Sequence, residues 1–467
     1  MPYTSDQRRG FERASPLGHV PTIQHPLVAE RLQLYVRPKR QAQDRSIIDE
    51  RLIDPAELDQ DSWDIGTVAA VDGSPFEQEV EPDFPATRAL FIQVAGVAVD
   101  LERFNQRSGP FADPVAVIEA QEAAVAAGFL PSSNLPRRDG ADPLTAFREE
   151  LYKFFAETVV QQKSLLDMLI QVEAFSPSGA PPTDHVWLEV CPNPDCRRKL
   201  SGNQVERADW LAVPRNGCEC PACATKLLPT DALRVDAAFR PYSSNLEAAG
   251  RVMTASEHLT YTAVLTDLAS RLPAALRSMA FITDGPLALF GEVAPIKRSL
   301  LLLLQNLAED RRQQAMSPPV VLGVEKSGEF VDHALAIREL VPAGRLMLLD
   351  DDYIARHIRH RDNTFGEDTY YGRKFFYRTR DERMLVITVP PLAEVGTEPY
   401  RRGISLDIRQ YPTLKATCGL LDRIGTRLFD DALIPIALAH SYAAYPLRTA
   451  GQVLKLHTEQ HLGEPRS

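Results

Sequence analysis

The sequence has little of what a membrane-bound or secreted protein needs. Its longest apolar run, Leu300-Leu-Leu-Leu-Leu304, is far too short to cross a bilayer, and the first residues lack a charged-then-apolar signal pattern. The chain has only 6 cysteines, and five of them fall between Cys191 and Cys223 instead of spreading as a disulfide framework would. We therefore expect a cytoplasmic protein with no membrane segment.

Acidic residues outnumber basic ones, 63 to 52, and the common nucleotide and hydrolase motifs are missing. The formal net charge of −11 argues against a protein that coats nucleic acid non-specifically, so any such binding must use a focused basic patch. The chain contains no phosphate-cradling Gly-Lys-Ser/Thr loop, no Gly-x-Ser-x-Gly elbow and no internal repeat. Its 467 residues, 44% of them hydrophobic, are enough for two or three domains with a full core.

Two strand-like stretches end on an Asp-Gly pair. Thr67-Val-Ala-Ala-Val71 runs into Asp72-Gly-Ser74, and Phe281-Ile-Thr runs into Asp284-Gly-Pro, so the chain is predicted to turn at both aspartates. Ligands of open α/β sheets bind beyond the strand ends, which makes Asp72 and Asp284 a candidate site for a hard divalent cation. The alternative is that each aspartate only closes a turn.

The rest of the chain alternates between helical and strand patterns. Helical spacing of apolar residues predicts helices over 113–127, 146–174, 246–272 and 295–314, and strands are predicted over 88–100 and 318–324. This alternation indicates an α/β fold with a mixed, partly parallel sheet flanked by helices. We divide the chain into an N-terminal arm (1–62), a first part of the main domain (63–182), an insertion (183–232) and a second part (233–467).

The insertion carries two short cysteine turns, Cys191-Pro-Asn-Pro-Asp-Cys196 and Cys218-Glu-Cys220-Pro-Ala-Cys223. Paired turns of this kind supply four thiolates to a tetrahedral zinc ion without a large core. We assign Cys191, Cys196, Cys220 and Cys223 as the ligands of a structural Zn²⁺ in a zinc ribbon. Cys218 is the spare cysteine, because a gap of two residues is the commoner spacing.

Three features outside these motifs have two interpretations each. Basic and aromatic residues interleave around Arg356, Arg373 and Lys374, which suits DNA binding but also a hairpin with a solvated basic face. His440 ends an apolar run, as a core histidine or as a metal ligand and general base. Lys326 follows a predicted strand, where it stabilises developing phosphate charge or is merely solvated.

Five motifs in one order resemble the NurA nuclease family. They are Val71-Asp72-Gly-Ser74, Phe281-Ile-Thr-Asp284-Gly-Pro-Leu, Gly323-Val-Glu-Lys326-Ser, Leu348-Leu-Asp350 to Ile354, and Ile434-Pro-Ile-Ala-Leu-Ala-His440. The resemblance spans residues 67 to 455. The zinc ribbon and the N-terminal arm lie outside the family's minimal pattern.

This resemblance implies an RNase H-like fold and a nuclease that depends on Mn²⁺, or Mg²⁺, and acts on DNA ends. It also implies a homodimer that works with a HerA-like hexameric ATPase in DNA end processing or phage defence. Asp72 and Asp284 match the family's metal-binding aspartates, and His440 matches its metal-site histidine. A further carboxylate is expected from the helix before Asp284; we choose Glu257, with Asp267 as the alternative.

Two functions from other classes compete with the nuclease. One is a catalytically inactive zinc-ribbon adaptor that docks a DNA translocase complex. The other is a zinc-ribbon component of a transcription or RNA-processing assembly. Convergence of Asp72, Glu257, Asp284 and His440 within metal-sharing distance would distinguish an active site from a scaffold.

Overall fold

The computed structural model describes residues 19–36, 45–60, 63–82, 84–106, 121–177, 179–196, 210–359, 365–400, 404–425, 433–445 and 450–462. The chain divides into two units, residues 1–47 and 48–467. The first unit contains α1 (Val20–Gln24) and α2 (Pro26–Leu32), neither of which buries a side chain. Ile48 is buried and β1 (Leu52–Ile53) pairs with a strand of the main sheet, so both belong to the second unit. The division into an arm (1–62), an insertion (183–232) and two parts of a main domain stays a prediction.

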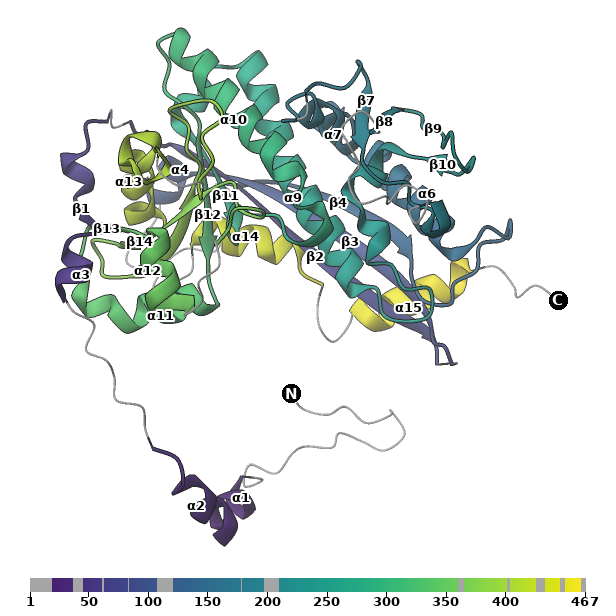
Figure 1. Ribbon diagram of the computed structural model, residues 1–467, viewed down its shortest axis with the longest axis horizontal. Helices are drawn as coiled ribbons and strands as arrows, with labels where there is room; N and C mark the ends of the chain where they lie inside the picture. Colours follow the sequence, from purple (N-terminus) through teal and green to yellow (C-terminus); the bar gives the residue numbers. More distant parts are fainter. Residues whose placement is uncertain are drawn as a thin grey trace. The chain divides into compact units, whose positions relative to one another are not determined.

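A nine-stranded mixed sheet organises the second unit (Figure 1). Its strand order is β1-β13-β14-β15-β12-β11-β2-β3-β4, and β2, β11 and β12 run parallel at its centre while the other pairs are antiparallel. The remaining strands of the sheet are β2 (Thr67–Glu81), β3 (Thr87–Asp100), β4 (Gln121–Pro131), β11 (Met279–Asp284), β12 (Val320–Glu325), β13 (Arg345–Leu348), β14 (Arg373–Arg378) and β15 (Met384–Val389). The predicted α/β class with a mixed sheet is confirmed.

Helices cover both faces of this sheet and create two hydrophobic cores. One core joins the sheet to α6, α7, α9 and α10, and the other joins it to α13 and α14. The helices of the second unit are α4 (Leu101–Gln106), α6 (Pro143–Glu157), α7 (Leu165–Glu173), α9 (Leu246–Arg271), α10 (Ile296–Gln313), α11 (Glu329–Ile337), α12 (Asp351–Tyr353), α13 (Leu414–Ile424), α14 (Ile434–Ala443) and α15 (Ala450–His461). The boundary between the two units falls within α3 (Arg45–Asp49). Over the described residues, none of the helices has both the length and the hydropathy of a membrane span.

Two of the predicted helices are correct and two are not. α9 and α10 match the helices predicted over 246–272 and 295–314. The segment predicted as a helix over 113–127 forms β4 from Gln121 onward, and 113–120 lie outside the described residues. Pairing with β3 along its whole length overrides the helix preference of this alanine-rich stretch.

The long helix predicted over 146–174 is two helices separated by a short hairpin. α6 ends at Glu157, and β5 (Val159–Val160) pairs with β6 (Lys163–Ser164) before α7 begins. Gln161 and Gln162 adopt left-handed backbone conformations, with φ of 49° and 69°, which no helix can contain. Ser164 and Asp167 then form a capping box that starts α7.

The cysteine-bearing module consists of two small hairpins. β7 (His185–Leu188) pairs with β8 (Leu211–Pro214), and β9 (Cys218–Glu219) pairs with β10 (Lys226–Leu227). A buried ion pair between Arg148 of α6 and Asp231, 2.6 Å long, attaches the end of the module to the helical layer. The module is thus part of the second unit.

Candidate active site

Asp72 and Asp284 lie side by side on parallel strands. The last paired residues of β2 and β11 are Val71 and Thr283, so the two aspartates that follow face each other in register. Asp284 ends β11, as predicted. Asp72 does not end its strand: β2 continues through Gly73 to Glu81, because its hydrogen-bonded pairing with β3 continues through this region. The Asp72 turn predicted from the sequence is therefore wrong, although its position opposite Asp284 agrees with the predicted pairing of the two carboxylates.

Because β11 ends at Asp284, helices on both faces of the sheet place side chains near Asp72 and Asp284. On one face, α14 packs against β2 through Ile436 and Ala439, and it carries His440 toward Asp72. Pro435 in the first turn favours the start of this helix. On the other face, α9 packs against β2 and β3 and carries Glu257.

Gly73 allows α9 to approach the strand closely. A Cβ atom on Gly73 would lie 2.5 Å from Cγ of Met253 and 2.7 Å from Oε1 of Glu257, so no larger residue fits there. Its backbone N–H donates a hydrogen bond to the Glu257 carboxylate. A glycine inside an apolar strand signals such a close approach, but the sequence analysis assigned it to a turn.

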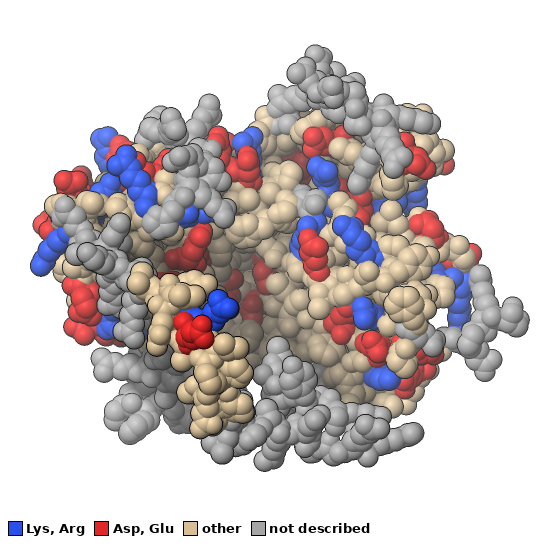
Figure 2. All heavy atoms as spheres, turned by 60° about the horizontal axis from the view of Figure 1, so that its bottom comes forward, with Lys and Arg blue, Asp and Glu red and all other residues tan. Residues whose placement is uncertain are grey.

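The assembled cluster has the spacing of a metal site. One ligand atom from each of Asp72, Asp284 and His440 lies within 4.8 Å of the others. Nδ1 of His440 is 2.8 Å from Oδ2 of Asp72, and Nζ of Lys326, directly after β12, is 2.8 Å from Oδ2 of Asp284. Asp72 is only 8% exposed. Figure 2 shows one face of the molecule hollowed near its middle, with Asp and Glu side chains inside the hollow.

Burial and mutual repulsion make the negative charge of this cluster costly. Burial raises the pKa of the Asp72 carboxyl most, and the nearby Asp284 raises it further, while the hydrogen bond with His440 lowers it. The pKa of Glu257 is raised well above its usual value by burial and by the charges of Asp72 and Asp284. The Glu257 side chain is half-buried, and burial is the main cause of its raised pKa. Carboxylates crowded in this way favour a bound cation.

The donor set fits a divalent metal ion. Carboxylate oxygens with one imidazole nitrogen suit Mn²⁺, and the oxygens alone suit Mg²⁺. Asp267, the alternative to Glu257, lies ten residues further along α9, about 15 Å away along the helix axis. It is paired with Arg271 instead. Glu257 is therefore the carboxylate of α9 closer to the cluster, and the charges of Asp72 and Asp284 act on it. Its carboxylate is not one of the three groups that lie within 4.8 Å of one another, so three of the four predicted ligands converge.

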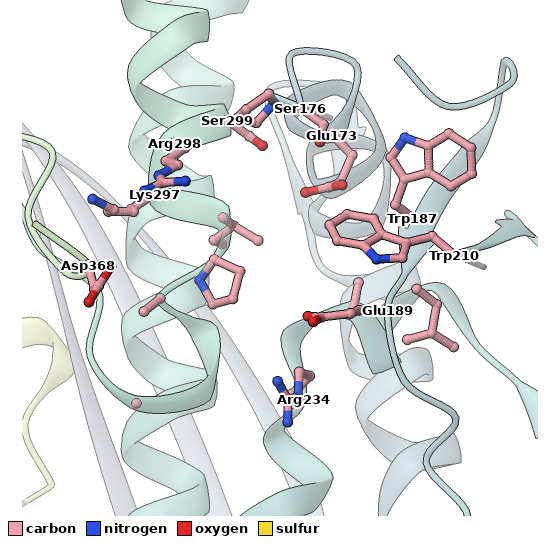
Figure 3. A pocket seen from close by; sticks show the side chains of 17 residues that line it. Glu173, Ser176, Trp187, Glu189, Trp210, Arg234, Lys297, Arg298, Ser299 and Asp368 are labelled. Carbon is pink, nitrogen blue, oxygen red and sulfur yellow. The ribbon is translucent and has the colours of Figure 1, made fainter. Parts of the chain in front are cut away.

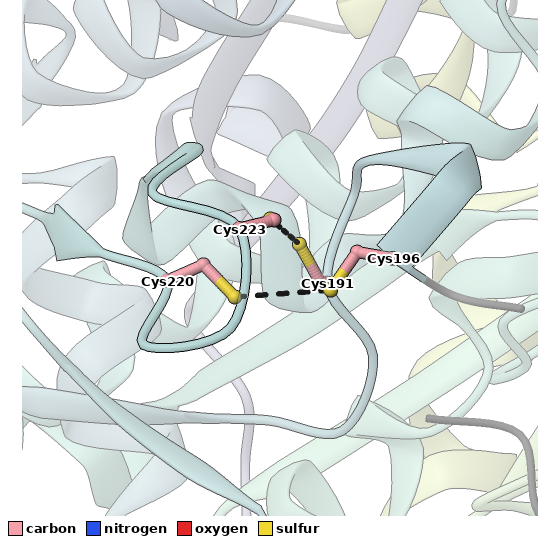
Figure 4. Close-up of side chains that lie close together, drawn as sticks. All are labelled: Cys191, Cys196, Cys220 and Cys223. Atoms are coloured by element: carbon pink, nitrogen blue, oxygen red, sulfur yellow. Dashed lines mark hydrogen bonds between the residues drawn. The ribbon is translucent and has the colours of Figure 1, made fainter. Parts of the chain in front are cut away.

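The four cysteines chosen from the sequence form a second cluster (Figure 4). Sγ of Cys191 lies 3.8 Å from Sγ of Cys223, and Sγ of Cys196 lies 3.9 Å from Sγ of Cys220. These separations are too long for disulfides. When four sulfur atoms bind one zinc ion tetrahedrally, each sulfur lies about 3.8 Å from the other three. The geometry thus fits a closed Zn²⁺ site without Cys218.

Two of the three residues predicted to bind DNA are buried. Arg373 is 0% exposed; it donates to the backbone oxygens of Leu349 and Pro399 and pairs with Asp351. Lys374, also 0% exposed, pairs with Glu325 and lies over the ring of Phe330, 4.1 Å from its centroid. Their predicted role is wrong, because neither side chain can reach a phosphate.

Arg356, the third of these residues, has a different environment. It lies in a π-helical segment (Ile354–Arg359), where its side chain is 71% exposed and its Nε is 2.8 Å from Asp352. DNA contact by Arg356 therefore stays a prediction.

Comparison with known proteins gives only distant likenesses. No protein-family model matches the chain, and no curated protein matches it. The crystal structure of the NurA nuclease from Sulfolobus solfataricus is similar at 10% identity, covering 95% of this chain and 94% of that chain, with a TM-score of 0.32. A NurA structure with manganese has 12% identity, covers 96% and 98%, and has a TM-score of 0.29. TM-scores this low carry no weight for the site, whose function is inferred from its own residues.

Proposed function

We propose that this chain is a metal-dependent deoxyribonuclease that hydrolyses phosphodiesters at DNA ends. One observation carries the proposal: Asp72, Asp284 and His440, chosen from sequence motifs far apart in the chain, offer ligand atoms within 4.8 Å of one another. Glu257 lies outside this group of three, but its carboxylate accepts a hydrogen bond from the backbone N–H of Gly73, the residue after Asp72. A catalytically inactive adaptor does not require such a cluster, so the closeness of these three residues supports an active site over a scaffold.

Asp72, Asp284 and His440 would hold Mn²⁺ or Mg²⁺, with Glu257 completing the site. A divalent ion bound there supplies an activated water and neutralises charge on the phosphate oxygens. The protein's own contribution is to fix the ligands in place. Asp72 orients the imidazole through its contact with Nδ1, and the rigid β2–β11 pairing holds the two aspartates in register.

Lys326 contributes a positive charge at the edge of this site. In the absence of DNA its Nζ contacts Asp284, and its side chain is 37% exposed, so it can turn toward a phosphate without a burial penalty. We propose that it stabilises the negative charge that develops on the phosphate in the transition state. Arg356 would contact the DNA backbone further from the reacting atoms.

The Cys191, Cys196, Cys220 and Cys223 cluster would hold a structural Zn²⁺ that takes no part in the reaction. Four thiolates close the coordination sphere, which leaves no position for a water or substrate. We propose that the ion keeps the two cysteine turns together, because β9 and β10 contribute only two residues each.

The wider assignments come from the motif resemblance alone. They are an RNase H-like topology, a homodimer, a HerA-like ATPase hexamer as partner, and a role in DNA end processing or phage defence. The two short helices of the first unit, which bury none of their side chains, are available for a protein contact of this kind.

A digestion assay tests the function directly. Linear double-stranded and single-stranded DNA, end-labelled, is incubated with the purified protein in Mn²⁺, in Mg²⁺ and without added divalent ion, each with and without a co-expressed HerA-like ATPase. We expect shortening of labelled DNA only when the divalent ion is present. No cleavage under any of these conditions would favour the adaptor.

A further inference from the structure

A cavity of about 590 Å³ lies between the cysteine-bearing module and α10, apart from the carboxylate cluster (Figure 3). Its volume is that of a small-ligand site. Two of the chain's 3 tryptophans, Trp187 of β7 and Trp210 just before β8, line it together with Glu173, Arg234 and Ser299. We call it the indole pocket.

The walls of the indole pocket are held by buried polar contacts. Glu173, at the end of α7, is 7% exposed, and its carboxyl accepts hydrogen bonds from the Ser299 hydroxyl of α10 and the backbone N–H of Trp187. Nε1 of Trp187 donates to the backbone oxygen of Gly179 at 2.8 Å. Its indole is thus fixed before any ligand arrives, which lowers the entropy lost on binding.

Arg234 is a cation with unused binding capacity. It adopts a left-handed backbone conformation, with φ of 54°, between two short 3₁₀ helices, Pro229–Leu233 and Val235–Ala237. Its Nε is buried and has no hydrogen-bond partner among the described residues. In contrast, Lys297 and Arg298, which also line the pocket, both pair with Glu398. Arg311 and Arg378 also have one buried guanidinium nitrogen without a partner in the described part of the chain. Arg234 differs from them because it lines the indole pocket, where a bound anion could reach its guanidinium.

We propose that the indole pocket binds one nucleotide unit, with the base against Trp187 and Trp210 and the phosphate on Arg234. Indole rings stack on any base, and a guanidinium binds phosphate oxygens with charge-assisted hydrogen bonds. The segment that follows Asp284 leads to Gly291 and Ala294, which line the pocket, so one stretch of chain joins the two sites. As a contact for the substrate strand, the pocket rests on the proposed nuclease function; as a nucleotide site it does not.

Calorimetric titration of the full chain, without added divalent ion, tests this proposal with ligands that separate base from phosphate. The probes are dAMP, deoxyadenosine, inorganic phosphate and a short thymidylate oligomer. We expect dAMP and the oligomer to bind more tightly than deoxyadenosine or phosphate alone. Arg234→Gln should weaken dAMP binding by about tenfold or more and leave deoxyadenosine nearly unchanged.

Matched variants keep the result independent of folding. Trp210→Ala should weaken both dAMP and deoxyadenosine by about tenfold, whereas Trp210→Phe should retain most of the affinity because a ring remains. Lys226→Gln removes an exposed positive charge from the same module, outside the pocket, and should bind dAMP like the parent.

Three outcomes would overturn the proposal: no dAMP binding by the parent, equal dAMP affinity in the parent and Arg234→Gln, or binding of a short arginine peptide in place of dAMP. The last would mean that Glu189 and Asp368, which also line the pocket, select a cation. The digestion assay is read separately. Cleavage without dAMP binding refutes only the pocket, and dAMP binding without cleavage refutes only the nuclease.

Discussion

Nδ1 of His440 lies 2.8 Å from Oδ2 of Asp72, although 368 residues separate them in the chain. The contact joins α14 on one face of the sheet to the middle of β2, opposite the end of β11. An imidazole held in this way by a carboxylate has a defined orientation, as metal-site histidines have.

The first prediction concerns His440. Its side chain is 63% exposed, so His440→Ala should leave the fold intact while the affinity for Mn²⁺ falls by about tenfold or more, because one ligand is lost. Calorimetric titration with Mn²⁺ measures the affinity of each protein. His457→Ala, an exposed histidine of α15, is the matched control. Equal Mn²⁺ affinity in parent and His440→Ala would remove His440 from the site.

The second prediction concerns Lys326, whose Nζ contacts Asp284. Lys326→Gln should lower kcat for DNA cleavage by about 100-fold, with a smaller change in KM, because its charge matters most in the transition state. Steady-state kinetics at saturating Mn²⁺ provide the measurement, and Lys455→Gln on α15 serves as control. An unchanged kcat would show that Lys326 is a solvated residue.

The third prediction concerns the cysteine cluster. Elemental analysis of freshly purified protein should find one zinc per chain, and Cys220→Ser should lose it, because its sulfur is one of four that lie within 4.8 Å of one another. Cys218→Ser is a sharp control, since this neighbouring cysteine lies outside the cluster and its loss should leave the zinc content unchanged. Protein that contains no zinc would refute the site.

The fourth prediction concerns pH and Glu173, away from both clusters. Burial raises its pKa from 4.5 to about 7 in the folded protein. Because the folded state holds this proton more tightly than the unfolded state, the stabilisation is complete below pH 4.5 and is lost as the pH rises through about 7. Above that pH the free energy of unfolding is lower by about 3 kcal/mol, because the rise in pKa from 4.5 to about 7 is worth about 1.4 kcal/mol per pKa unit.

Glu173→Gln cannot ionise, so its stability should fall less between pH 5 and pH 8 than that of the parent. Urea unfolding at several pH values measures the difference, and Glu150→Gln, a carboxylate on α6 that pairs with Lys153, is the control. If parent and Glu173→Gln lose stability in parallel, Glu173 does not carry this proton.

Local patterns were sufficient for part of the fold and the site. The apolar run that ends at Asp284 forms β11, and the leucine-rich periodicity forms α10, because each pattern is complete within its own segment. The spacing of Cys191, Cys196, Cys220 and Cys223 identified the cysteine cluster for the same reason.

The errors fall where a distant partner decides the structure. The Asp72-Gly73 sequence is typical of a turn, but β2 continues to pair with β3 beyond Gly73, and this pairing keeps the two residues extended. The basic and aromatic residues that alternate around Arg373 and Lys374 predict a DNA-binding surface. Asp351 and Glu325 approach from other elements and pair with these two cations in the interior, which no local pattern reveals.

The fifth prediction, and the most direct test of the active site, is the cleavage rate of Asp72→Asn and Asp284→Asn in Mn²⁺. Each substitution removes one negative charge from the cluster without adding bulk, so the fold should persist, with unchanged circular dichroism and zinc content. Cleavage should fall by at least about a thousandfold, which corresponds to about 4 kcal/mol of activation free energy. Asp332→Asn, an exposed carboxylate of α11, should cleave like the parent. Parent-like cleavage by Asp72→Asn and Asp284→Asn would contradict the assigned site.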